Sequence, residues 1–345
     1  MRRAFFVVLL LASASALGLL GQAQVPRLIV YTYDSFASWG PAPFIEEEFE
    51  KEHRVDVQFV ATADSRAMLA KLIRERAAGE QGADVFIGVE AADLPTVWAH
   101  GLFIPLTVED VPELANLPPG LLIDPQREAI PYEHGYITFV YDSQVLAVED
   151  VPRTFEELLD PKYRKMLILE DPRTSSPGLS FLLWTIHRFG DPGYLDYWKD
   201  LLPNVLTIAG GWGEAYDLFQ GGEGPIVLSF STDTAYSVIE GGSARYKVML
   251  LDNQGYRNIY LMGVVQGTDK VELAKEFLNF VLSREVQERI PTTEWMFPAN
   301  PAALLPVQFY QYAVVPPEPV MLPPAEVGEN LDRWLREWAQ VVVGG

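Results

Sequence analysis

The chain of 345 residues is strongly acidic, with a formal charge of −21 at pH 7, and it contains no cysteine. Nucleic acids and anionic membrane surfaces attract basic patches, so this charge argues against either as a partner. A cationic ligand would suit the charge, although acidity also keeps proteins soluble. The absence of cysteine excludes disulfides and thiol chemistry, and an apolar content of 49% is enough for two packed lobes.

The first residues are typical of a secretory signal peptide. Arg2 and Arg3 precede the apolar run 4–12, and small residues then lead to an acceptable cleavage site at 21–23. We predict that residues 1–23 are removed near Ala23, which leaves a soluble protein in a periplasm-like space. The leader has no lipoprotein cysteine, and its apolar run is too short to span a bilayer as a helix. An uncleaved anchor is the alternative.

Strand and helix patterns alternate in the region that follows the leader. Apolar runs of strand length occur at 28–33, 55–60 and 82–88, and helical spacing of apolar residues occurs at 44–53 and 65–78. Continuous apolar strands that alternate with helices predict a doubly wound, mostly parallel sheet covered on both faces.

Residues 105–131 are rich in proline and lack periodicity, which predicts surface wrapping without regular elements. Beyond them the α/β pattern resumes. Predicted strands are 136–141, 167–170, 205–208 and 226–230, and predicted helices are 179–188, 195–202, 214–220 and 234–240. The apolar run 259–265 is long enough to return to the first sheet, and it is followed by helices at 271–282 and 325–341.

Aromatic and polar side chains follow several predicted strands, at the edge where open α/β sheets place their ligands. One more such group lies in the loop 291–298, which is dense in bulky residues. These candidates are Tyr33, Asp34, Ser35, Trp212, Phe230, Tyr236 and Trp295. Large rings also pack in cores and on helix surfaces, so none of them alone establishes a site.

The segment 171–178 joins a predicted strand to a predicted helix and carries Thr174, Ser175, Ser176 and Gly178. Hydroxyls and free backbone N–H groups at a helix N-terminus predict an anion or phosphate site, with Arg173 as a further donor. An ordinary N-cap followed by proline explains the same residues. Both interpretations stay open.

Signatures of catalysis are mostly absent. The sequence has no zinc-protease helix motif, no Walker loop and no nucleophile elbow, and its four histidines are isolated. Asp34, Asp84, Glu90 and Glu133 could still pair across a cleft, so acid–base catalysis is not excluded by these residues.

Five segments together resemble, in order and spacing, the thiamine-binding periplasmic proteins of ABC importers; they are 31–41, 171–178, 211–219, 228–236 and 290–298. The segment 154–161 is similar to solute-binding proteins generally. The resemblance implies a type II-like periplasmic binding fold with two α/β lobes and a ligand in the cleft between them. It places lobe one at 24–132 and 256–300 and lobe two at 133–255 and 301–345, with crossings near 131–136 and 255–260.

The resemblance also implies roles for particular residues. Tyr33, Trp212, Tyr236 and Trp295 would form an aromatic cage for the thiazolium, a permanent cation that ring faces attract. Ser175 and its neighbours would receive the hydroxyethyl end or its phosphate, so thiamine monophosphate and diphosphate are expected ligands too.

Three residues depart from the family pattern, and one of them is His134, which stands where an aromatic residue is expected. Phe230 stands where a tyrosine is expected, and it keeps the ring without the hydroxyl. Glu133 stands where an aspartate is expected, and it can still offset the thiazolium charge with a longer reach.

The resemblance further implies inner-membrane ABC permease subunits as partners, a monomer, no cofactor or metal, and no enzymatic activity. A thiaminase-like transferase has a similar fold but depends on a cysteine nucleophile, which this chain lacks. A polyamine or another organic cation is a closer alternative, because such ligands also use aromatic rings and carboxylates. Ferric ion fits less well, since no adjacent tyrosine pair occurs.

Overall fold

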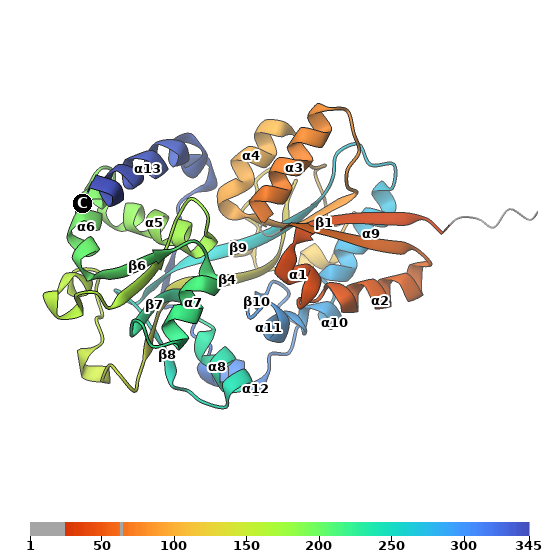
Figure 1. The fold of residues 1–345 in the computed structure, drawn as a ribbon. Coiled ribbons are helices and arrows are strands. Elements are labelled where there is room, and N and C mark those ends of the chain that lie inside the picture. The colour runs from red at the N-terminus through yellow and green to blue at the C-terminus, as the bar shows by residue number, and fades with distance from the viewer. Residues whose placement is uncertain (1–24, 63–64, 345) are drawn as a thin grey trace, which may run out of the picture.

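The computed structural model describes residues 25–62 and 65–344, so the predicted signal peptide, residues 1–23, lies outside the described residues. Its strands are β1 (Arg27–Tyr33), β2 (Asp56–Thr62), β3 (Val85–Glu90), β4 (Ile130–Asp142), β5 (Leu167–Glu170), β6 (Val205–Ala209), β7 (Ile226–Phe230), β8 (Tyr246–Met249), β9 (Gln254–Val264), β10 (Phe297–Pro298) and β11 (Glu318–Val320). They join in one sheet with the order β2-β1-β3-β9-β4-β7-β5-β6, and the remaining strands pair with β4 or β9 (Figure 1).

The long strands β4 and β9 form the centre of this sheet. They pair antiparallel from Ile130 opposite Met262 to Ile137 opposite Tyr256. On its other edge β9 pairs with β3, from Tyr260 to Val264. From Ile137 to Asp142, β4 pairs with β7 on its other edge and with β8 beyond the stretch that it shares with β9. The predicted parallel pairing is found in both flanks, between β1 and its neighbours and between β5 and its neighbours. The centre is antiparallel because β4 carries the chain into the second half and β9 brings it back.

Two large hydrophobic cores belong to the two halves of the sheet. The first core collects buried residues from 28–132 and 259–299, and we call this half lobe one. The second core collects buried residues from 137–251, Tyr256 and residues 322–338, and we call this half lobe two. The two-lobe α/β architecture expected from the sequence is therefore confirmed.

The helices of the described chain are α1 (Asp34–Ser38), α2 (Ala42–His53), α3 (Ser65–Ala77), α4 (Leu94–His100), α5 (Ser176–Phe189), α6 (Gly193–Leu201), α7 (Trp212–Gln220), α8 (Asp233–Gly241), α9 (Val271–Val281), α10 (Arg284–Gln287), α11 (Ile290–Thr293), α12 (Val307–Tyr312) and α13 (Pro324–Gly344). Apolar spacing explains the longer ones: α2, for example, buries Ala42, Ile45 and Phe49 on one face. All predicted helices are present. The sequence pattern missed eight short elements, none of which exceeds seven residues: α1, α4, α10, α11, α12, β8, β10 and β11. One or two turns of helix give no clear period.

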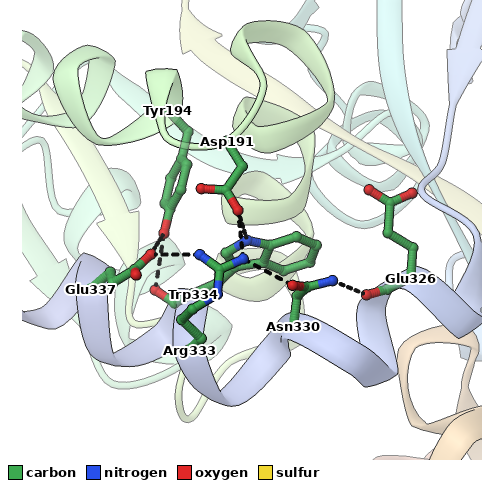
Figure 2. Close-up of polar contacts among 7 residues, drawn as sticks. All are labelled: Asp191, Tyr194, Glu326, Asn330, Arg333, Trp334 and Glu337. Carbon is green, nitrogen blue, oxygen red and sulfur yellow. Dashed lines mark hydrogen bonds and ion pairs between the residues drawn. The ribbon is translucent and has the colours of Figure 1, made fainter.

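The C-terminal helix α13 packs against lobe two and forms hydrogen bonds with it. Trp334 and Trp338 are buried in the second core. Figure 2 shows Asp191 accepting hydrogen bonds from the Arg333 guanidinium (2.5 Å) and the Trp334 indole (3.0 Å), while the Tyr194 hydroxyl donates to Glu337 (3.1 Å). Among the described helices, neither α13 nor any other combines the length and apolar character needed to cross a membrane.

Candidate functional site

Tyr33 ends β1, and its hydroxyl lies at the centre of a group of oxygen atoms. The hydroxyl is 2.8 Å from the Tyr132 hydroxyl, 3.3 Å from Oε1 of Glu133 and 3.1 Å from Oε2 of Glu294. Tyr132 and Glu133 come from β4, and Glu294 follows α11. We call Tyr33, Tyr132, Glu133 and Glu294 the Tyr33 cluster. It brings the predicted Tyr33 and Glu133 together with two residues that the sequence did not single out.

A bulge in β4 explains how consecutive residues reach the same phenol. Neighbouring side chains on a regular strand point to opposite faces of the sheet. Between Pro131 and Glu133, however, the pairing with β9 shifts by one residue. Such a bulge re-aims side chains locally, so Tyr132 and Glu133 can both approach Tyr33. Strand periodicity alone would have separated them.

The two carboxyls of the Tyr33 cluster are desolvated. Glu133 is only 1% exposed. Oε2 of Glu133 and Oε1 of Glu294 are buried and accept no hydrogen bond within the described chain. Burial, and then repulsion from Glu294, raises the pKa of Glu133 well above its ordinary value, and burial raises the pKa of Glu294 to about 7. The site therefore resists carrying two negative charges.

Trp212, Tyr236 and Trp295 lie in one continuous series of ring contacts. Trp212, the first residue of α7, stacks on Tyr216 with ring centroids 4.9 Å apart. Tyr216 meets Tyr236 edge to face at 6.0 Å, and Tyr236 meets Trp295 in the same way at 4.8 Å. We call these four residues the aromatic row. Tyr216 is the member that the sequence analysis did not single out, although it lies one helical turn after Trp212.

Trp295 and its neighbour Glu294 join the aromatic row to the Tyr33 cluster. They are consecutive residues, and Trp295 adopts a left-handed backbone with φ of +58°. This conformation is strained for a tryptophan, and strain of this kind is concentrated at functional sites. Through these two consecutive residues, the group of contacts around Tyr33 and Glu133 is joined along the chain to the ring contacts of Tyr236.

The hydroxyl segment before α5 has the geometry of a helix cap. The Ser175 hydroxyl accepts a hydrogen bond from the backbone N–H of Gly178 (3.5 Å) and donates one to Oε2 of Glu170 (2.8 Å). Gly178 leaves room for this turn, since a Cβ there would lie 2.5 Å from the Glu170 carbonyl oxygen. Burial raises the pKa of Glu170 to about 8. Anion binding by this segment stays a prediction, because the Ser175 proton already points to a buried acid.

The other residues of this segment make separate contacts. Thr174 is exposed and donates to the Gly210 carbonyl (2.7 Å). Arg173, the predicted further donor, is exposed and its Nε donates to Asp171 (2.9 Å). Ser176 lies 3.4 Å from the hydroxyl of Tyr260, whose ring is 6.3 Å from that of Tyr33. Tyr260, on β9, therefore links the start of α5 to the Tyr33 cluster.

Asp34, Ser35 and Phe230 lie at the ends of β1 and β7. Asp34 is exposed and accepts a hydrogen bond from the Ser38 hydroxyl (3.0 Å), within α1. The Ser35 carbonyl accepts the Gly40 N–H (2.8 Å) and closes the same short helix. Phe230 is partly buried and packs against both large cores. Roles for these three residues in ligand binding stay predictions.

Metal binding by clustered side chains is not indicated. Within residues 25–62 and 65–344, no group of three histidine, aspartate or glutamate residues is placed to hold a metal ion. The chemistry available at the Tyr33 cluster and the aromatic row is instead that of ring faces, phenols and buried carboxyls. These groups suit an organic cation.

The fold and this arrangement of residues define a two-lobe solute-binding protein. Residues 80–316 match the family model described as bacterial extracellular solute-binding protein. The chain is 37% identical to the thiamine-binding periplasmic protein of Brucella abortus biovar 1 (strain 9-941), over 94% of this chain and 95% of the relative. It is 34% identical to the thiamine-binding periplasmic protein of Escherichia coli (strain K12), over 92% and 94% of the two chains.

A solved structure agrees with these relatives. A periplasmic thiamin binding protein superposes with a TM-score of 0.81 at 33% identity, and the match covers 93% of this chain and 98% of that one. The chain belongs to the bacterial extracellular solute-binding protein family and, within it, to the thiamine-binding periplasmic proteins. It is accordingly a binding protein and not an enzyme, which removes the thiaminase-like alternative.

Proposed function

We propose that the protein captures thiamine in the periplasm and delivers it to an inner-membrane ABC permease. The observation that carries this proposal is the junction at Glu294 and Trp295, consecutive residues of which the first belongs to the Tyr33 cluster and the second to the aromatic row. A thiazolium cation is attracted to ring faces by about 0.5–2 kcal/mol per good contact, and buried carboxyls offset its charge. The relatives named for thiamine binding support the same choice of ligand.

The proposal also covers the phosphorylated ligands, the oligomeric state, the lobe boundaries and the cleavage of the signal peptide. Thiamine monophosphate and diphosphate would place their phosphates near Thr174, Ser175, Ser176 and Gly178, at the N-terminus of α5. We infer a monomer with lobe one at 24–132 and 256–300 and lobe two at 133–255 and 301–345. The two separate cores support this division except at Tyr256, which is buried in the second core. Export would remove residues 1–23 near Ala23.

Isothermal titration of the purified protein tests the ligand. Thiamine should bind, and Tyr236→Leu should weaken its binding about 2- to 30-fold, the equivalent of one cation–π contact. Tyr310→Leu is the matched control, because Tyr310 is 67% exposed on α12 and outside the aromatic row. If thiamine and both of its phosphates give no heat beyond dilution, the proposal is wrong.

A polyamine is the second candidate. The unpartnered oxygens of Glu133 and Glu294 would suit an ammonium group as well as they suit a thiazolium. Competition separates the two, since a thiamine-binding protein should retain thiamine in a large excess of spermidine. Displacement of thiamine by equimolar spermidine would favour the polyamine.

A further inference from the structure

The Tyr33 cluster has more close oxygen contacts than its phenols can supply with hydrogens. Three contacts converge on the Tyr33 oxygen, from Tyr132, Glu133 and Glu294. Each contact needs one hydrogen, and the two phenols carry one hydrogen each. If Tyr33 donates to one carboxylate and Tyr132 donates to Tyr33, the remaining carboxyl must bring its own hydrogen. A proton on one glutamate completes the arrangement.

The surroundings of the cluster also favour one proton on the pair. Burial, the neighbouring carboxyl and phenols set the pKa values of Glu133 and Glu294, with no contribution from a basic group. The neighbouring groups are Tyr33 on β1, Tyr132 on β4 and Tyr260 on β9, all of which are phenols. Glu90 on β3 adds a further acidic group near Tyr260. His134 follows Glu133 but stacks on Phe297, and burial lowers its pKa to about 4, so it supplies no positive charge.

We propose that Glu133 and Glu294 share one proton and that a bound organic cation takes the place of this proton. The inference rests on the proposed function, because it assigns the cation of that ligand to the Tyr33 cluster. A cation beside the pair stabilises two carboxylates, which the free site does not. Binding then releases a proton to solvent. The affinity for the cation therefore rises with pH, up to the pH at which the free protein has already lost this proton.

Titration in two buffers with different ionisation enthalpies measures the released protons directly. Above the pKa of Glu294, which is about 7, the pair keeps one proton, and the wild-type protein should release close to one proton per thiamine there. Affinity should rise by up to tenfold per pH unit until that proton is lost. The double variant Glu133→Gln/Glu294→Gln should release no proton from this pair and show a flat profile. Glu285→Gln, an exposed change on α10, is the control and should behave as wild type.

Carbon-13 NMR of protein labelled at its glutamate carboxyls detects the protonation of the pair in the absence of a ligand. One glutamate carboxyl should titrate near neutral pH in the wild type and be missing from the double variant. Glu170, whose pKa is also raised, should remain in both spectra as a reference. The variant's near-UV circular dichroism should match that of the wild type, so that a lost signal is not a lost fold.

The outcomes separate this inference from the proposed function. Thiamine binding without proton release would overturn the proton exchange and leave the proposed function intact. Failure of both thiamine and spermidine to bind would overturn both. A wild-type spectrum in which only Glu170 titrates near neutral pH would overturn the shared proton whatever binds.

Discussion

Glu170, at the end of β5, is a carboxyl that folding places in an unfavourable environment. It is 1% exposed, and its Oε1 atom has no hydrogen-bond partner within the described chain. Burial raises its pKa from 4.5 to about 8. Between these two values the folded protein keeps a proton that the unfolded chain releases. The free energy of unfolding should therefore fall as pH rises through this window.

Glu170→Gln tests this argument, because glutamine keeps the shape and cannot ionise. The variant should differ little from wild type in urea unfolding at about pH 5 and should be more stable by up to a few kcal/mol at about pH 8. Glu149→Gln, at an exposed position, should show no such pH dependence. An equal loss of stability at both pH values would mean that Ser175 stabilises a charged Glu170.

At the scale of elements, α13 contacts both halves of the molecule. Its indoles and the Asp191 contacts of Figure 2 hold it to lobe two. Near its start, Gly328 packs against Pro95 of α4, which belongs to lobe one; a Cβ at Gly328 would lie 2.6 Å from Cγ of Pro95. The absence of a side chain at Gly328 is what allows this close approach.

Gly328→Ala should therefore destabilise the protein even though alanine favours helices. A ring atom of proline cannot move aside easily, so the added methyl group should cost about 1–3 kcal/mol through overpacking. This cost should exceed the gain of about 1 kcal/mol that alanine brings over glycine in helix propensity. Gly241→Ala is the matched control at the end of α8, where a Cβ would meet nothing within 4 Å. A Gly328→Ala protein that melts at or above the wild-type temperature would show that α13 and α4 separate freely.

For the whole molecule, the charge of −21 should assist the capture of a cationic ligand. A negative field raises the local concentration of cations, and salt screens it over a Debye length of about 10 Å at 0.1 M. The association rate of thiamine, followed by stopped-flow tryptophan fluorescence, should fall several-fold between about 0.02 M and about 0.5 M salt, with little change in the dissociation rate. A salt-independent association rate would restrict the electrostatic effect to the Tyr33 cluster.

Much of the fold was predictable because apolar runs and helical spacing of apolar residues are local patterns. The strands 167–170 and 226–230 coincide with β5 and β7, and the spacing of apolar residues located α3 and α9. The start of β4 was not predictable, since Pro131, Glu133 and His134 interrupt its apolar pattern and the pairing with β9 extends it back to Ile130. Tertiary pairing overrides local propensity in such strands.

The sequence by itself determined the two-lobe α/β class and the aromatic residue types of the site, because periodicity and strand-end chemistry are local properties. Only the tertiary structure decided which of these side chains meet. The bulge in β4 and the left-handed backbone at Trp295 bring Glu133 and Glu294 to one phenol. Neither feature follows from residue type, since each depends on packing between segments far apart in the chain. The paired carboxyls that define the inferred proton exchange are a product of that packing.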